Sequence, residues 1–315
     1  MKSILFTLLS LFLISSAFAD TNKSSKPQVK QKKDIYYNPP ASVADVSYGS
    51  DERNVLDFWQ APGEGPHPLY FYIHGGGWLG GDKSRVFRVQ DYLDKGISVA
   101  SINYRLTKTD ILPAPVHDAA RALQFVRSKA QEWNIDKKKV VLAGGSAGAC
   151  TAMWIACHDD LANPESSDPV ERESTRVSGI VVAGGQTSID PKQAGPWIGP
   201  KVYHGMIIMA VGEQNIEAVF KNYAQHEKLF KEFSPINHLT QDDPPLYLSY
   251  GDHMEVPAAS FGSGIHHGMF GIKMKEKSEQ VDHKKVFLNI SKHQKSEAYS
   301  DPKAFIYELL LGEKK

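Results

Sequence analysis

Short apolar runs separated by glycine, proline and charged residues recur along most of the chain from residue 43 onward. Runs rich in Val, Ile, Leu, Tyr and Phe predict strands, and apolar residues at helical spacing predict helices. The expected strands cover 55–60, 69–73, 97–104, 140–143, 179–184, 246–250 and 286–290, and the expected helices cover 85–95, 115–133, 147–158 and 302–311. This alternation predicts an α/β fold, with a mostly parallel twisted sheet and helices on both faces.

Residues 186–243 interrupt the alternation, because they form a long, aromatic and helix-prone stretch without a strand pattern. A segment of this kind is typical of an insertion that caps a sheet rather than joining it. We therefore expect one α/β domain over residues 43–315, with a cap-like insertion at about 186–243.

The first 42 residues have a different character. A basic start at Met1-Lys2, an apolar run over 4–14 and an A-x-A site at residues 17–19 predict a signal peptide, cleaved after Ala19. The apolar run is too short for a membrane anchor. Residues 20–42 are rich in Lys, Ser, Gln and Pro, which is typical of a flexible linker. We expect a periplasmic or secreted protein with no membrane attachment after cleavage.

Composition excludes several classes of protein. The 36 basic and 36 acidic side chains give a formal net charge of zero, so the chain lacks the basic field of a nucleic-acid-binding protein. Its two cysteines, Cys150 and Cys157, are too far apart for a disulfide if they share one helix. No Cys/His spacing matches a structural zinc site, so we expect neither a metal nor a cofactor. The sequence leaves the oligomeric state open.

The strongest chemical signal is Gly-Gly-Ser-Ala-Gly at residues 144–148, between an expected strand and an expected helix. This is the context of a G-x-S-x-G nucleophile elbow, which would present Ser146 at the carboxyl edge of the sheet. A second glycine run, His-Gly-Gly-Gly-Trp at 74–78, also follows a strand. The amides of Gly76, Gly77 and Ala147 are the candidate oxyanion hole, although a glycine loop alone could equally hold a phosphate.

With these motifs the chain resembles the α/β-hydrolase superfamily, and most of all its hormone-sensitive-lipase-like and feruloyl-esterase-like bacterial carboxylesterases. The resemblance covers about residues 48–311 and also rests on Ser-Ile-Asn-Tyr-Arg at 101–105 and on Pro113 and Asp118 at a helix start. It implies an α/β-hydrolase fold and catalytic residues in the order serine, acid, histidine.

The acid is expected after the strand at 246–250, where the chain reads Gly-Asp-His-Met-Glu-Val-Pro. This segment is one residue shorter than the resemblance leads us to expect. Asp252 is the first candidate and Glu255 the second. Asp252 could instead make a local Asx-turn.

The base must lie at the carboxyl edge of the sheet to reach Ser146. His293 directly follows the last expected strand, in the usual place, although the usual neighbouring glycine is missing. His266 and His267 also follow a carboxyl edge and are the alternatives, whereas His283 is at the opposite edge. For a histidine paired with a carboxylate, we expect activity to rise with pH through about 6.5–7.

These residues predict an exported serine hydrolase that cleaves carboxylic esters without a cofactor. Ser146 would attack, His293 would transfer the proton and Asp252 would hold the imidazolium ion. Acyl groups on polysaccharides are the expected substrates by analogy alone. An amidase or peptidase would use the same residues. A catalytically degenerate hydrolase that binds a glycan or a protein is the alternative of another class, because the contexts of the acid and the histidine are unusual.

Overall fold

The computed structural model describes residues 38–299 and 301–313. The chain divides into a unit over Met1–Asp34 and a unit over Ile35–Lys315, and only the second contains described residues. The predicted signal peptide and most of the predicted linker lie outside this range. Within the described part of the chain, no helix combines the length and the apolar character needed to cross a membrane.

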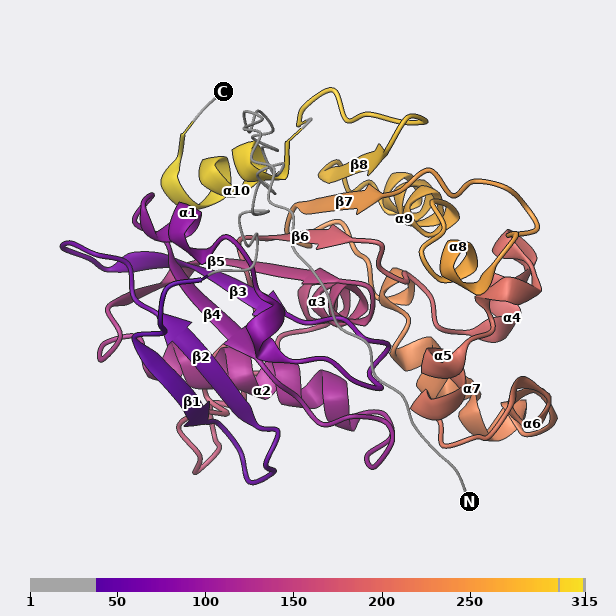
Figure 1. The fold of residues 1–315 in the computed structure, drawn as a ribbon, viewed down its shortest axis with the longest axis horizontal. Helices are drawn as coiled ribbons and strands as arrows, with labels where there is room; N and C mark the ends of the chain where they lie inside the picture. Colours follow the sequence, from indigo (N-terminus) through magenta and orange to yellow (C-terminus); the bar gives the residue numbers. More distant parts are fainter. Residues whose placement is uncertain (1–37, 300, 314–315) are drawn as a thin grey trace, which may run out of the picture. The chain divides into compact units, whose positions relative to one another are not determined.

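The core of the second unit is an eight-stranded sheet with the order β1-β2-β4-β3-β5-β6-β7-β8 (Figure 1). Its strands are β1 (Val43–Ser47), β2 (Val55–Trp59), β3 (His67–Ile73), β4 (Ser98–Ile102), β5 (Ile135–Gly145), β6 (Gly179–Ala183), β7 (Leu246–Tyr250) and β8 (Val286–Ile290). Strand β2 pairs antiparallel with β1 and β4, and all other pairs are parallel. The prediction of a mostly parallel sheet is confirmed.

The sequence analysis did not predict β1. Four of its five residues are exposed, because it is an edge strand that contacts the rest of the sheet only through β2. An exposed edge strand needs no apolar run, and so it gives no hydrophobic signal.

Ten α-helices are described: α1 (Val89–Leu93), α2 (Ala114–Ser128), α3 (Ala147–Cys157), α4 (Pro191–Ile198), α5 (Gly205–Ala210), α6 (Ile216–Lys221), α7 (Tyr223–Glu232), α8 (Phe261–Ile265), α9 (Met269–Gln280) and α10 (Pro302–Leu311). Side chains of β3 alternate between two cores. Leu69 and Phe71 belong to the same apolar cluster as residues of α2, α3 and α9, whereas Tyr70 belongs to a second cluster with residues of α1 and α10. The helices therefore cover both faces of the sheet, as predicted.

The helix predicted over 85–95 is shorter than expected. The structure has a 3₁₀ helix at Lys83–Arg85 and starts α1 only at Val89. Between them Arg88 takes a left-handed conformation with φ of 61°. The Asn38 side chain bonds to the carbonyl of Val86 and to the amide of Val89. This side chain, more than 45 residues away in sequence, satisfies backbone groups that a continuous helix would have used internally.

The segment 186–243, between β6 and β7, contains α4 to α7 and two 3₁₀ helices, at Pro200–Val202 and Pro235–Asn237. Figure 1 shows α4 to α7 gathered on the side toward which the arrowheads of β6 and β7 point. These helices therefore lie at the carboxyl edge of the sheet, where parallel α/β folds place their ligands. Cys150 and Cys157 are buried free thiols on α3, consistent with the prediction that they do not form a disulfide.

Candidate active site

Ser146 is the single residue between β5 and α3, and its backbone has φ of 55° and ψ of −123°. Positive φ is uncommon for a residue with a side chain and marks local strain. The turn is held by a bond from the Ser146 amide to the carbonyl of Ala183, 2.9 Å long. It also requires Gly148, because a Cβ there would collide with the carbonyls of Ile73 and His74. The sharp turn presents the serine hydroxyl at the edge of the sheet.

The glycine loop follows β3 and lies against this turn. A Cβ on Gly75 would come within 2.6 Å of the Gly145 carbonyl, so only glycine allows the two backbones to meet. Gly76 and Gly77 both have positive φ, 118° and 66°. Among the described residues, none accepts a hydrogen bond from the backbone amides of Gly76, Gly77 or Ala147. Three free donors therefore lie close to Ser146, as an oxyanion hole requires.

His74 braces the glycine loop. It is fully buried, its Nδ1–H donates to the carbonyl of Gly75 at 2.8 Å, and its ring stacks on Tyr104 at 4.2 Å. The Tyr104 hydroxyl donates to the His74 carbonyl at 2.7 Å. Burial lowers the pKa of His74 to about 4, and the nearby Arg53 guanidinium acts in the same direction. His74 is therefore neutral at ordinary pH and fixes the loop from behind.

The histidine that meets the nucleophile is His266. Its Nε2 lies 3.0 Å from the Oγ of Ser146. It caps the carboxyl end of α8, where the Gln186 side-chain amide donates to the carbonyl of Ile265. The ring packs over Gly184, since a Cβ on that glycine would lie 3.3 Å from the His266 Cδ2. The geometry suits proton transfer from the serine hydroxyl to an imidazole nitrogen.

Among the described residues, the His266 side chain makes one hydrogen bond, to Ser146, and no carboxylate is bonded to its ring. The pKa of His266 is lowered from its ordinary value by burial and, second, by the neighbouring His253, and no acidic group contributes. A hydrogen-bonded carboxylate would instead favour the charged ring and raise the pKa. The structure therefore shows a Ser–His pair rather than a triad.

The structure does not bring His293, the predicted base, to Ser146. Residues 291–294 form a tight turn in which Gln294 pairs back with Ile290, the last residue of β8. This turn ends the strand at once and leaves the His293 side chain exposed. The contact with Ser146 belongs to His266, one of the two alternatives that the sequence analysis retained.

The predicted acid, Asp252, is also not bonded to the histidine at Ser146. Asp252 is exposed, and its carboxylate pairs with Lys292 at 3.3 Å. Its own backbone amide and, second, Lys292 lower its pKa. The second candidate, Glu255, has an exposed side chain, and only its backbone carbonyl accepts the Nε2–H of His267 at 3.0 Å. His267 is fully buried and holds the loop that leads to α9, so it supports the structure rather than meeting the serine.

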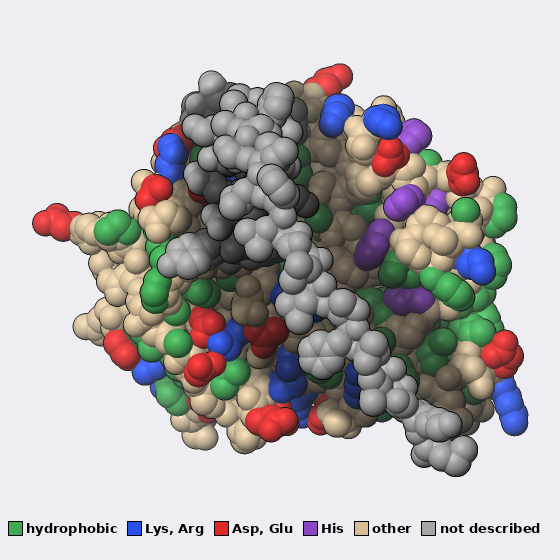
Figure 2. Space-filling view, in the orientation of Figure 1, with side chains coloured by type: hydrophobic (Ala, Val, Ile, Leu, Met, Phe, Trp, Pro, Cys, Tyr) green, Lys and Arg blue, Asp and Glu red, His purple; other side chains and the backbone are tan. Residues whose placement is uncertain are grey.

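A cavity of about 550 Å³ opens over Ser146 and is lined by the glycine loop, His266, Arg85 and His204. His204, from the start of α5, uses its Nδ1 to accept a hydrogen bond from the backbone amide of Met206, while its buried Nε2 has no partner in the part of the chain that the structure describes. Burial and, second, His266 lower the pKa of His204 to about 4. Figure 2 shows histidine side chains gathered on this face, over the part that Figure 1 labels α5, α8 and α9.

The doubly covered sheet, the strained serine between β5 and α3, and the glycine loop after β3 define an α/β-hydrolase. The chain belongs to the BD-FAE family, whose model matches residues 56–259. The match includes the glycine loop, Ser146 and Asp252, and it ends before His266.

Curated relatives agree with this assignment. A probable carboxylic ester hydrolase, LipM of Mycobacterium tuberculosis, is 27% identical over 221 residues, which cover 68% of this chain and 48% of LipM. Esterase LipQ of the same organism is 25% identical over 227 residues, which cover 67% of this chain and 49% of LipQ. The chain thus spans about half the length of these relatives.

Solved structures show the same fold. A truncated carbohydrate esterase from gut microbiota is 20% identical with a TM-score of 0.61, and the match covers 82% of this chain and 88% of that one. An esterase from Thermogutta terrifontis, Est2, is 19% identical with a TM-score of 0.57, and the match covers 87% of this chain and 90% of the Est2 chain.

The sequence patterns did not predict three residues near the site. Gly184 and Gln186 position His266, and His204 contributes an unpaired ring nitrogen near the cavity. A glycine just after an expected strand is a weak signal for close packing. Gln186 and His204 lie in the segment 186–243 between β6 and β7, where no motif marks them.

Proposed function

We propose that this protein is a serine esterase that uses a Ser146–His266 pair. The contact of 3.0 Å between Ser146 Oγ and His266 Nε2, next to three unpaired amides, is the observation that carries the proposal. The family match and the curated relatives named as ester hydrolases support the reaction class.

In the acylation step, Ser146 Oγ attacks the ester carbonyl while His266 Nε2 takes the hydroxyl proton. The amides of Gly76, Gly77 and Ala147 stabilise the negative oxygen of the tetrahedral intermediate. His266 then gives its proton to the leaving alcohol, and the acyl group remains on Ser146. A water molecule, deprotonated by His266, attacks this ester, and the serine recovers its proton as the carboxylic acid leaves.

Short acyl esters of carbohydrates are the proposed substrates. The cavity of about 550 Å³ suits a small acyl group together with part of a sugar. Support also comes from the solved relatives, which include a carbohydrate esterase from gut microbiota and an acetyl ester-xyloside bifunctional hydrolase.

The decisive experiment follows release of nitrophenol from its acetyl ester by the wild type and by Ser146→Ala. Loss of essentially all turnover in a folded variant, together with loss of labelling by a fluorophosphonate probe, supports the proposal. An acetylated xylan tests the carbohydrate preference, and an acetanilide tests the amidase alternative.

One observation favours a second function, a degenerate hydrolase that binds a glycan or protein. No carboxylate among the described residues orients His266. Under this alternative, folded wild-type protein would neither label nor turn over at any pH, whereas glycan binding would survive in Ser146→Ala.

We also propose export to the periplasm or the medium, with cleavage after Ala19. This rests on the basic start, the apolar run and the A-x-A site. Amino-terminal sequencing of the protein recovered from the producing cell is expected to begin at Asp20. An amino terminus at Met1 would contradict the proposal.

A further inference from the structure

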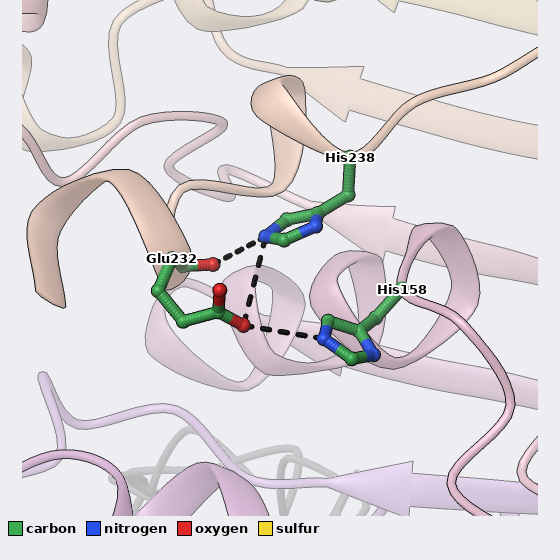
Figure 3. A group of neighbouring side chains, drawn as sticks. All are labelled: His158, Glu232 and His238. Carbon is green, nitrogen blue, oxygen red and sulfur yellow. Dashed lines mark hydrogen bonds and ion pairs between the residues drawn. The ribbon is translucent and has the colours of Figure 1, made fainter. Parts of the chain in front are cut away.

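His158, Glu232 and His238 form a cluster of ligand-type side chains away from Ser146. Their candidate ligand atoms all lie within 4.8 Å of one another (Figure 3). His158 caps the carboxyl end of α3, Glu232 ends α7, and His238 caps the 3₁₀ helix Pro235–Asn237. Ser146 is at the other end of α3, roughly 18 Å away along the helix axis. The cluster is thus distinct from the candidate active site.

The hydrogen bonding of His158 directs the lone pair of its Nε2 at the carboxylate of Glu232. Its Nδ1 is 2.9 Å from the backbone carbonyl of Asp159, which can only accept, so the proton of a neutral ring sits on Nδ1. The Nε2 is then an acceptor, yet it faces the Oε1 of Glu232 at 3.2 Å. Two acceptors at this distance repel each other unless a proton or a metal ion lies between them.

His238 is the third side chain of the cluster, and it also faces the Glu232 carboxylate. Its Nε2 lies 3.9 Å from the Oε1 of Glu232 and also contacts the Glu232 backbone carbonyl. That carbonyl has a second donor, the Nε1–H of Trp154 at 2.9 Å. His238 can therefore release the carbonyl and turn its nitrogen to a cation without leaving the oxygen unpaired.

We propose that His158 Nε2, Glu232 Oε1 and His238 Nε2 bind a divalent transition metal of the zinc class, with water completing the coordination. Two imidazoles and one carboxylate are a donor set that Zn²⁺ accepts. Tetrahedral bonds of about 2.0–2.1 Å separate neighbouring ligand atoms by about 3.3 Å. The separation of 3.2 Å already fits, whereas His238, at 3.9 Å from the Glu232 Oε1 and within 4.8 Å of the His158 ligand atom, must move toward the other two ligands.

The surroundings allow an ion to enter and be held. The His158 and His238 side chains are 22% and 20% exposed, and His238 also lines a hollow of about 910 Å³. The Trp154 ring lies 4.3 Å from the His158 ring and keeps it in place. The ion would clamp the insertion between β6 and β7 to the helix that begins at the candidate nucleophile. Its role would be structural, not catalytic.

Sequence spacing could not reveal this site. The three ligands are spread over 81 positions and only the fold brings them together, which is why the sequence analysis predicted no metal.

Zinc uptake by the untagged protein, stripped with a chelator, tests the proposal. Titration at pH 7.5 is expected to show one Zn²⁺ per chain at micromolar affinity or tighter, and saturation is expected to raise the melting temperature by several degrees. Replacing the ion with Co²⁺ is expected to give the visible absorption of a tetrahedral site with nitrogen and oxygen ligands. Each of His158→Gln and His238→Gln is expected to weaken binding at least tenfold.

His226→Gln is the matched control. His226 pairs with Glu213 at 2.7 Å in the same segment, 186–243, but no third ligand-type side chain joins them among the described residues, so its replacement is expected to leave zinc binding unchanged. His266→Ala, which removes the histidine at Ser146, is likewise expected to retain the ion. Absence of uptake by the wild type, or uptake that neither His158→Gln nor His238→Gln weakens, would overturn the proposal. A protonated His158 paired with Glu232 would then account for the geometry.

Discussion

The Nε2 of His266 lies 3.0 Å from the Oγ of Ser146, although His266 precedes the last strand of the sheet. The histidine that follows that strand, His293, is exposed in a tight turn. Chain order and geometry therefore assign the proton-transferring residue differently. Since only a histidine within hydrogen-bond reach can take the serine proton, we give priority to the geometry.

His266→Ala is expected to lower kcat on nitrophenyl acetate by about three orders of magnitude, because a nucleophile and its base act as a unit. His293→Ala is the matched control, and it is expected to change kcat and KM less than twofold. Circular dichroism checks that both variants fold. Large loss of activity in His293→Ala with a mild effect in His266→Ala would reverse the assignment.

The pH profile of kcat/KM reports the pKa of the same residue, His266. Burial and His253 lower the pKa of His266, so the neutral, competent ring persists below the ordinary histidine range. Activity is expected to rise with pH through a midpoint under about 6.5, the ordinary histidine pKa. This is lower than the range of 6.5–7 expected for a carboxylate-paired histidine.

The exposed His253 offers a check on the cause of the lowered pKa of His266. His253→Gln removes a like charge near His266, so the midpoint is expected to move upward by a fraction of a pH unit. A wild-type midpoint above 7 would show that a carboxylate pairs with the base in solution.

Much of the fold was predictable because its strands carry strong local signals. β7, β8 and α10 have the predicted bounds, since each is an apolar run with clear ends. Edge strand β1 and the break before α1 could not be predicted. The first is exposed, and the second depends on Asn38, which is distant in sequence.

The candidate site was predictable only in part for a related reason. Ser146 and the glycine loop are local motifs, in which glycines and strand ends fix the backbone. The partner histidine depends on how residues 251–268 fold across the sheet edge, and no local pattern encodes that path. The contacts that direct it, from Gln186 to Ile265 and from His267 to Glu255, link positions that the sequence does not mark as neighbours.

Gly184→Ala tests whether close packing against Gly184 positions the His266 ring. The new Cβ would lie 3.3 Å from the His266 Cδ2, so the ring must shift away from its place at Ser146. We expect kcat to fall by about tenfold or more with little change in KM, because misplacement of a reacting group by a fraction of an ångström lowers its effective concentration. Gly96→Ala is the control, since Gly96 also has positive φ but has open space around it. Equal kinetics in the two variants would mean that Gly184 does not position His266.

Gly76→Ala tests the oxyanion loop. Gly76 has φ of 118°, and a Cβ there would collide with the Gly80 carbonyl, so the loop must move and its amide must turn away. Loss of one oxyanion donor costs about 3 kcal/mol of transition-state stabilisation, so kcat is expected to fall by about two orders of magnitude. Gly63→Ala, at φ of 96° in open space, controls for backbone strain. A rise in KM alone would indicate a distorted cavity instead.

His74→Gln tests whether the brace behind the glycine loop limits stability in acid. The folded-state pKa of His74 is about 4, below the unfolded value of about 6.5. Between these values the unfolded chain binds more protons, so the stability of the wild type falls as pH decreases from 6.5 to 4. From pH 7 to pH 4.5 this residue accounts for a loss of about 2.5 kcal/mol in the free energy of unfolding.

Glutamine can still donate to the Gly75 carbonyl but does not titrate, so His74→Gln is expected to be less stable than the wild type at pH 7 and to lose less stability on acidification. Urea unfolding at the two pH values measures both quantities. The contributions of His204 and His266, whose pKa values are also lowered, remain in both proteins and cancel in the difference. Equal losses in the wild type and His74→Gln would show that His74 is already solvated, and that the glycine loop is not held by a buried neutral ring.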